Sequence, residues 1–336
     1  MYLTFYGLHE KPFATTPDPR FLYLTPGHRE ALAHLVYGVK EKTGFLLLTG
    51  DVGTGKTSLL QALLEKLDSN TAVAFIVNSG LSFDGILEYL LEELGISTAG
   101  ASRAQRLVVL RRFLVERAHV GQTVLLIFDE AHHLDSETLE HIRLLSNFES
   151  PTQKHLQILL VGQPELKVKL ALPELRQLQQ RITLRTVVPR LSAQEIRPYI
   201  RRRLRIAGAR DLNVFTERAV SRIAAYAGGI PRIVNTVCEH GLLIGYGDQR
   251  RPLDVDVIKR AMRYLEDGSV PRTARSGLRR RRRLPRRRFA WVALTPVLLS
   301  LMALPAVRRE AFSSVSHFIT PFFITLVQSA RDLLGP

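Results

Sequence analysis

The chain has 336 residues, of which 46% are hydrophobic, and this is enough for one large domain or two modest ones. Its single cysteine, Cys238, excludes an intramolecular disulfide framework and a cysteine zinc cluster, so we expect a buried thiol in a reducing compartment. The net charge is +16, and residues 267–336 hold 13 Lys and Arg against 3 Asp and Glu, a net +10. A basic tail favours nucleic acid or an anionic membrane face as partner.

The first 26 residues are rich in proline and aromatic residues, and they lack the basic and apolar regions of a secretory signal. We expect them to form an extended arm that packs on the rest of the protein. A helix is predicted over residues 28–42, because apolar residues recur there at helical spacing.

From residue 45 onward, short apolar runs alternate with stretches of helical periodicity. The runs predict strands at 45–49, 73–77, 124–128, 156–161 and 182–188, and the periodicity predicts helices at 57–67, 83–94, 103–119 and 136–148. Apolar strands separated by helices indicate a parallel sheet covered on both faces. The predicted fold class is therefore α/β with three layers, and this domain, with the arm, takes residues 1–190.

The pattern changes after Pro189, where helical periodicity continues and apolar strand-like runs cease. Helices are predicted at 193–206, 216–227, 231–245 and 255–266. We therefore expect a small all-α lid domain over residues 191–266.

Residues 50–57 read Gly-Asp-Val-Gly-Thr-Gly-Lys-Thr and match the phosphate-binding pattern G-x-x-x-x-G-K-[ST] in full, between a predicted strand and a predicted helix. Backbone N–H groups of such a loop bind a polyphosphate, so ATP is the expected ligand. Lys56 should reach the β- and γ-phosphates, and Thr57 should coordinate Mg²⁺. The residues predicted to bind the nucleotide in this loop are Gly50, Asp51, Val52, Gly53, Thr54, Gly55, Lys56, Thr57 and Ser58.

A second motif makes a chance glycine loop a poor alternative. The apolar run at 124–128 ends in Asp129 and Glu130, which places two carboxylates at the sheet edge where ligands bind in open α/β folds. We expect Asp129 to hold Mg²⁺ and Glu130 to activate the attacking water. His132, which is followed by His133, completes the Asp-Glu-Ala-His box of one helicase group, but the chain has no room for a second RecA-like domain. We interpret both histidines as surface or interface residues.

Three further side chains suit an ATPase that works as an assembly. Gln163 follows the strand predicted at 156–161 and is a candidate contact for the γ-phosphate or the water. Arg181 or Arg176, just before the last predicted strand, is a candidate for reaching the nucleotide of a neighbouring subunit. A solvated surface arginine is the alternative for both.

The segment Gly-Gly-Ile-Pro-Arg at 228–232 opens a predicted lid helix, with its proline at the position that suits a helix start. Arg232 is predicted to reach back to the phosphates and to couple the lid to the nucleotide state.

An α/β core followed by a helical lid, with both motifs, a polar residue after a strand and Gly-x-Pro-Arg, resembles an AAA+ ATPase. More specifically, residues 1–266 are similar to the ExeA/GspA type of general-secretion-pathway ATPase and to the related secretion ATPases of exopolysaccharide and exosortase loci. The positions that carry this resemblance are 2, 5–8, 12–13, 16–19, 21–24, 44–45, 50–57, 128–132 and 162–166.

The resemblance implies an inner-membrane protein with a cytoplasmic ATPase and a transmembrane helix. In ExeA/GspA members a periplasmic peptidoglycan-binding domain follows, and these proteins help to place the secretin pore through the cell wall. Only 29 residues follow Val307. We therefore expect no such domain in this sequence and leave a cell-wall role open.

The tail supports the membrane interpretation. Eight of the ten residues at 279–288, at the end of a basic linker over 267–288, are arginines, and the 19 residues at 289–307 carry no charge. Such a segment spans about 28 Å as a helix, close to the hydrocarbon thickness of a bilayer. Trp291 suits the interface, and the arginines predict a cytoplasmic flank. A buried core segment is the alternative, and residues 308–336 form an apolar tail that makes either a hairpin or an interfacial helix.

These observations lead to one hypothesis and two alternatives. The hypothesis is an ATP-hydrolysing AAA+ ATPase, anchored in the bacterial inner membrane, that supports the assembly or energising of an envelope secretion or polysaccharide export system. Its expected partners are copies of itself, with a hexameric ring as one candidate, export components, and membrane lipids at the tail. One alternative is a nucleic-acid-associated helper ATPase of the transposition-regulator type, which would use the basic tail. The other is a nucleotide-sensing scaffold without turnover, against which the intact Glu130 argues.

Overall fold

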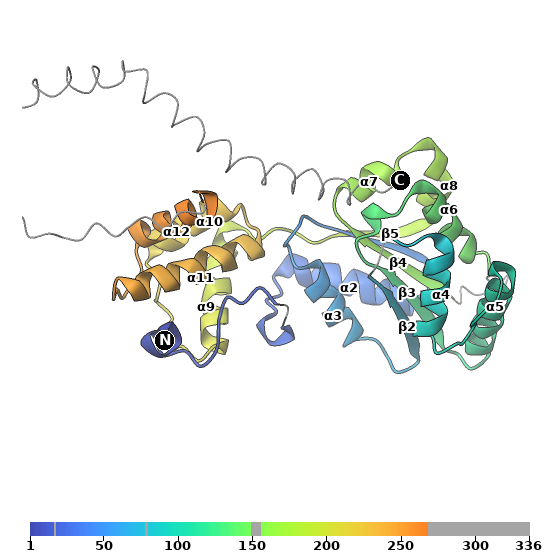
Figure 1. The fold of residues 1–336 in the computed structure, drawn as a ribbon, viewed down its shortest axis with the longest axis horizontal. Helices are drawn as coiled ribbons and strands as arrows, with labels where there is room; N and C mark the ends of the chain where they lie inside the picture. The colour runs from blue at the N-terminus through green and yellow to red at the C-terminus, as the bar shows by residue number, and fades with distance from the viewer. Residues whose placement is uncertain (17, 78–79, 149–155, 268–336) are drawn as a thin grey trace, which may run out of the picture. The chain divides into compact units, whose positions relative to one another are not determined.

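The computed structural model describes residues 1–16, 18–77, 80–148 and 156–267, and Figure 1 shows their arrangement. Within these ranges, none of the helices has the length and apolar character needed to cross a bilayer. The membrane segment predicted at 289–307, most of the basic linker and the apolar tail lie outside the described residues, so these remain predictions.

The core of the α/β part is a five-stranded sheet in which every pair of neighbouring strands is parallel. The strands are β1 (Phe45–Thr49), β2 (Thr71–Ile76), β3 (Thr123–Phe128), β4 (Leu156–Gly162) and β5 (Ile182–Val187), in the order β2-β3-β4-β1-β5. Because β4 lies between β1 and β3, the segments that follow these three strands meet at one edge of the sheet.

Side chains alternate between the two faces of the sheet and form two buried clusters. On one face, α2 (Pro26–Lys40) and α3 (Lys56–Leu64) pack on residues such as Leu46 and Leu125. On the other face, α4 (Phe83–Glu93), α5 (Arg103–His119) and α6 (Ser136–Leu145) pack on residues such as Leu47 and Leu126. Figure 1 shows the two helical layers with the sheet between them. The predicted three-layer α/β fold is thus confirmed.

Two short helices near the sheet edge were not predicted. They are α7 (Glu165–Leu170) and α8 (Arg176–Arg181), each six residues long. Six residues make fewer than two helical turns, so the apolar residues cannot establish a period. Both helices carry functional candidates: α7 begins two residues after Gln163, and α8 ends at Arg181.

Four helices follow the sheet, with bounds close to those expected. They are α9 (Ala193–Ile206), α10 (Glu217–Ala227), α11 (Pro231–Gly247) and α12 (Val255–Asp267). Ser192 and Glu195 form a capping box at the start of α9, and left-handed Gly228 ends α10. The proline at position 231 then starts α11 as its first residue, as the sequence predicts.

The amino-terminal arm packs with this helical region, whereas the sequence grouped it with the α/β domain. The arm was expected to be extended, but it begins with a short helix, α1 (Tyr2–Tyr6). Aromatic side chains of the arm share a core cluster with α9 to α12, and Phe13 meets Phe215 edge to face at 6.1 Å. The hydroxyl of Tyr2 donates to Glu239 Oε1 at 2.6 Å. Aromatic burial therefore directs the arm onto the lid helices.

A candidate nucleotide-binding site

The phosphate-binding loop connects β1 to α3 and has the backbone that its glycines allow. Gly53 and Gly55 have φ values of 79° and 102°, in a region that residues with a side chain rarely adopt. A Cβ atom at Gly53 would lie 2.6 Å from Cβ of Arg232, so the loop and the lid approach at van der Waals distance. The predicted loop is therefore formed, at the amino terminus of a helix where anions bind favourably.

Lys56 is the first residue of α3, and its side chain is buried beneath the loop. Its ammonium group donates to the carbonyl oxygens of Gly50 at 2.9 Å and Asp51 at 3.3 Å. Backbone carbonyls are weaker partners for an ammonium group than a phosphate is. The side chain is thus held at the loop, ready to exchange these contacts for phosphate oxygens.

The two acidic residues follow β3 directly, with distinct surroundings. Asp129 is buried, and its Oδ1 accepts the backbone N–H of Glu130 at 2.9 Å. Burial raises the pKa of the Asp129 carboxyl above its ordinary value, because the charged form lacks water. A nearby cation would offset this cost, and the carboxylate of Asp129 with the exposed hydroxyl of Thr57 offers the hard oxygen ligands that Mg²⁺ prefers. These residues therefore fit the metal that the motifs imply.

Glu130 has a left-handed backbone, with φ 51° and ψ 34°, which is uncommon for a residue other than glycine. Its side chain is 43% exposed and lines the same pocket as Lys56. The turn at Glu130 thus directs one carboxylate toward the pocket while Asp129 stays buried beside it.

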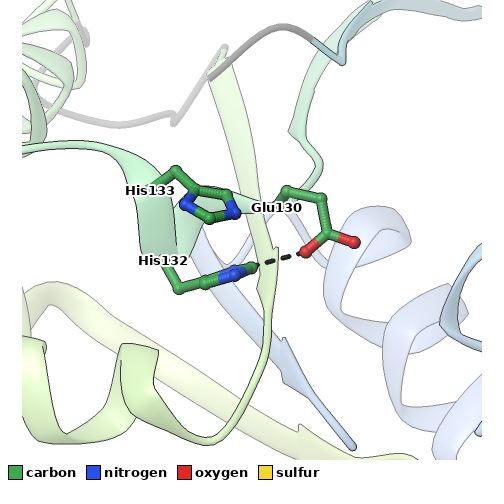
Figure 2. A group of neighbouring side chains, drawn as sticks. All are labelled: Glu130, His132 and His133. Atoms are coloured by element: carbon green, nitrogen blue, oxygen red, sulfur yellow. Dashed lines mark ion pairs between the residues drawn. The ribbon is translucent and has the colours of Figure 1, made fainter. Parts of the chain in front are cut away.

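His132 lies in this cluster, whereas we expected a surface or interface residue. Its side chain is 9% exposed, and its Nδ1 is 3.3 Å from Oε2 of Glu130 (Figure 2). Its Nε2 is 2.9 Å from Nε2 of Gln163, at the end of the neighbouring strand. His133 is exposed, as expected. His132 is a residue that sequence reasoning missed, although its position two residues after Glu130 was the available signal.

The lid contributes the start of α11 to the site. Arg232 is exposed and lines the pocket, and its backbone N–H donates to the carbonyl oxygen of Gly53 at 3.2 Å. Arg190 Nε donates to Asp51 Oδ2 at 2.6 Å, and this contact lowers the pKa of the Asp51 carboxyl. Two arginines therefore contact the phosphate-binding loop.

One pocket joins the loop, the lid and the amino-terminal arm. The sequence did not predict that the arm lines this pocket, because the contacts that place it there join residues far apart in the chain. Arg203 of α9 donates to the carbonyl oxygens of Pro12 at 2.5 Å and Ala14 at 3.3 Å. These contacts hold the arm beside the loop. The arm and α2 supply Ala14, Thr15, Thr16, Asp18, Phe21, Leu22, Tyr23 and His28 to the pocket lining.

The arginines suggested for a neighbouring subunit lie outside this pocket. Arg181 donates to Asn147 Oδ1 at 2.7 Å and to the hydroxyl of Ser146, and Arg176 is exposed at the start of α8. Neither residue is among those that line the pocket. A role for either arginine toward a second subunit stays a prediction.

Comparisons with known proteins identify the family of this chain. Residues 39–170 match the family model described as AAA domain. General secretion pathway protein A of Aeromonas hydrophila is 40% identical over 247 residues, which make up 73% of this chain. The chain is an AAA+ family member related to general secretion pathway protein A. The family predicted from the motifs is thereby confirmed, although the aligned residues span only 45% of the length of that relative.

Solved structures show the same AAA+ fold at low sequence identity. The Aeropyrum pernix ORC2 protein, solved as ADPNP-ADP complexes, has a TM-score of 0.55 and 18% identity, over 75% of this chain and 71% of its own. Cdc6p from Pyrobaculum aerophilum has a TM-score of 0.55 and 19% identity, over 71% of this chain and 68% of its own. These similarities support the fold of this chain.

Proposed function

We propose that this AAA+ chain binds ATP with Mg²⁺ in the pocket between the phosphate-binding loop and the lid, and that it hydrolyses ATP there. The observation that carries the proposal is that Lys56, Glu130 and Arg232 come from three separate parts of the sequence and line one pocket. A phosphate-binding cation, a carboxylate base and a second cation are the groups that phosphoryl transfer to water requires.

Each side chain has a distinct role in the proposed reaction. Lys56 exchanges its loop carbonyls for oxygens of the β- and γ-phosphates, and Glu130 accepts a proton from the attacking water. Arg232 adds positive charge from the lid, where negative charge develops on the transferred phosphoryl group. Thr57 and Asp129 would hold Mg²⁺, which neutralises charge on the triphosphate when it is bound.

The lid offers a route from nucleotide binding to a change of shape. Because α11 contacts the loop through Gly53, binding of a triphosphate to the loop and to Arg232 would draw the lid closer. We propose that Arg181 responds in an assembled oligomer by contacting the nucleotide of a neighbour, and that hydrolysis resets both contacts.

For the cellular role, we propose a membrane-anchored ATPase that supports an envelope secretion or export system. The relation to general secretion pathway protein A and the uncharged segment at 289–307, preceded by eight arginines, support this role. The anchor would keep the ATPase domain in the cytoplasm, next to the membrane components it serves.

Membrane fractionation of the full-length protein and of a chain ending at Glu266 tests the anchor, with ATP hydrolysis measured on both. The proposal expects the full-length protein to resist salt and alkali and to require detergent, while the shorter chain is soluble and still hydrolyses ATP. Release by high salt alone would contradict a spanning segment. Salt-sensitive DNA binding with DNA-stimulated hydrolysis would then favour the nucleic-acid helper function.

A further inference from the structure

The turn that carries Glu130 is fastened to the segment that follows β4. Lys169 of α7 donates to the carbonyl oxygens of His132 at 2.6 Å and Leu134 at 2.7 Å. Within the turn, the backbone N–H of His133 donates to the carbonyl oxygen of Glu130 at 3.0 Å. The backbone around the carboxylate is therefore fixed from α7, and α7 begins just after Gln163.

The His132 ring lies between Gln163 and Glu130, with one nitrogen facing each. A carboxylate only accepts hydrogen bonds, so the nitrogen that faces Glu130 makes a favourable contact when it carries the proton. This places the proton of a neutral ring on Nδ1 and leaves Nε2 as the acceptor. The Gln163 amide nitrogen, 2.9 Å from Nε2, is a donor, and the two contacts therefore require the same tautomer.

The contact between His132 and Glu130 is close but incomplete. The two facing atoms, Nδ1 and Oε2, are 3.3 Å apart, and both are buried. Neither atom has a hydrogen-bond partner in the described part of the chain. Buried polar atoms without a partner are costly, so a small movement of the carboxylate that completes this hydrogen bond would be favourable.

We propose that His132 is a positioning residue, which transmits the state of Gln163 to the carboxylate of Glu130. This inference rests on the proposed function, in which Glu130 is the base for ATP hydrolysis. When Gln163 turns toward a bound γ-phosphate, its amide releases Nε2 of His132, and the ring is free to complete its contact with Oε2. The base is then oriented in response to a triphosphate.

The same cluster has a competing interpretation as a metal site. One ligand atom from each of Glu130, His132 and His133 lies within 4.8 Å of the others (Figure 2). The two interpretations differ in what they require of His133. A metal site uses both rings, whereas the proposed relay, from Gln163 through His132 to Glu130, uses only His132. His133 therefore serves as a matched control.

The test compares the steady-state hydrolysis and ATP affinity of His132→Ala and His133→Ala with those of the parent. We expect His132→Ala to lower kcat about 10- to 100-fold, as the loss of a residue that orients a catalytic group does. Its Kd for ATP and its melting temperature should stay close to those of the parent, and His133→Ala should keep the parent kcat. An unchanged kcat in His132→Ala would overturn the proposal, and so would equal losses in both variants.

A double-mutant cycle with Gln163→Ala tests the connection itself. If His132 acts through Gln163, the double variant should be no slower than the slower single variant. If the two substitutions lower kcat independently, the double variant loses activity by the product of the two single factors, and this result would overturn the proposed role of His132. If His132→Ala does not fold, His132→Asn replaces it in the double-mutant cycle. The asparagine amide can still donate toward Glu130, but the contact with Gln163 is lost.

The parallel variant Glu130→Gln separates the two proposals. Parent-like hydrolysis by Glu130→Gln would remove the proposed base, and with it the proposed function. An inactive Glu130→Gln together with a fully active His132→Ala would overturn only the relay.

Discussion

The backbone N–H of Arg232 donates to the carbonyl oxygen of Gly53 at 3.2 Å, so the first turn of a lid helix rests on the phosphate-binding loop. A Cβ atom at Gly53 would lie 2.6 Å from Cβ of Arg232, which requires a glycine at this point of contact. A change in the conformation of the loop upon phosphate binding therefore acts directly on the first turn of this lid helix.

Replacement of Arg232 by alanine should weaken ATP binding while leaving the lid folded. The exposed guanidinium adds a charged hydrogen-bond donor to the pocket, and loss of such a donor raises the Kd for ATP about 10-fold. Arg218→Ala, at an exposed arginine of α10, is the matched control and should bind like the parent. Equal affinities in both variants, measured by titration with a fluorescent nucleotide, would argue against an Arg232 contact.

Replacement of Gly229 by alanine should destabilise the junction between the sheet and the lid. Gly229 has φ 81°, and a Cβ atom there would lie 2.3 Å from the carbonyl oxygen of Leu191. The left-handed backbone and the clash together should cost about 2 kcal/mol of unfolding free energy or more. Gly247→Ala is the control, because a Cβ atom at that position would have no neighbour within 4 Å, and it should be neutral or slightly stabilising in thermal unfolding.

Replacement of Arg203 by alanine should release the amino-terminal arm from the pocket. The buried guanidinium holds two arm carbonyls, contacts the hydroxyl of Tyr199 at 3.1 Å and lies 4.7 Å from the ring of Phe21. Loss of these contacts should cost about 2 kcal/mol or more and weaken nucleotide binding. The exposed Arg205 of the same helix provides the control, and arm cleavage by a protease reports release. Equal cleavage rates in the two variants would contradict this role.

His28 should make the stability of the protein sensitive to mild acid. Burial lowers the pKa of His28 below its ordinary value of 6.5, and a hydrogen bond with the Thr54 backbone opposes this shift only partly. The unfolded chain therefore binds a proton at a pH where folded His28 does not, so stability is present above about pH 6.5 and is lost as the pH falls toward the lower folded pKa. Urea unfolding between pH 7.5 and 5.5 checks this. His28→Asn should flatten the dependence, whereas His34→Asn, at an exposed position of the same helix, should not.

The parts of the site that were predictable depend on contiguous sequence patterns. The loop at 50–57 and the acidic pair after β3 are recognisable because each motif has fixed spacing and follows an apolar strand. The strand order could not be read from spacing, yet it decides the chemistry, because β4 places Gln163 between the loop and the turn of Glu130.

The features that were missed depend on contacts between distant residues. The role of His132 requires the pairing of β3 with β4, which brings it to Gln163. The arm reaches the pocket because Arg203 holds Pro12, 191 positions away in the chain. No local pattern of hydrophobicity encodes either contact, whereas α9, with its capping box and regular periodicity, was predicted with its bounds.

Phosphate release by the parent and by Glu130→Gln tests whether this pocket hydrolyses ATP with Glu130 as the base. The variant keeps the shape of the side chain and removes its basicity. We predict that it binds ATP as tightly as the parent and releases phosphate at least about 100-fold more slowly. A Glu130→Gln variant that binds ATP and releases phosphate at the parent rate would show that Glu130 is not the base.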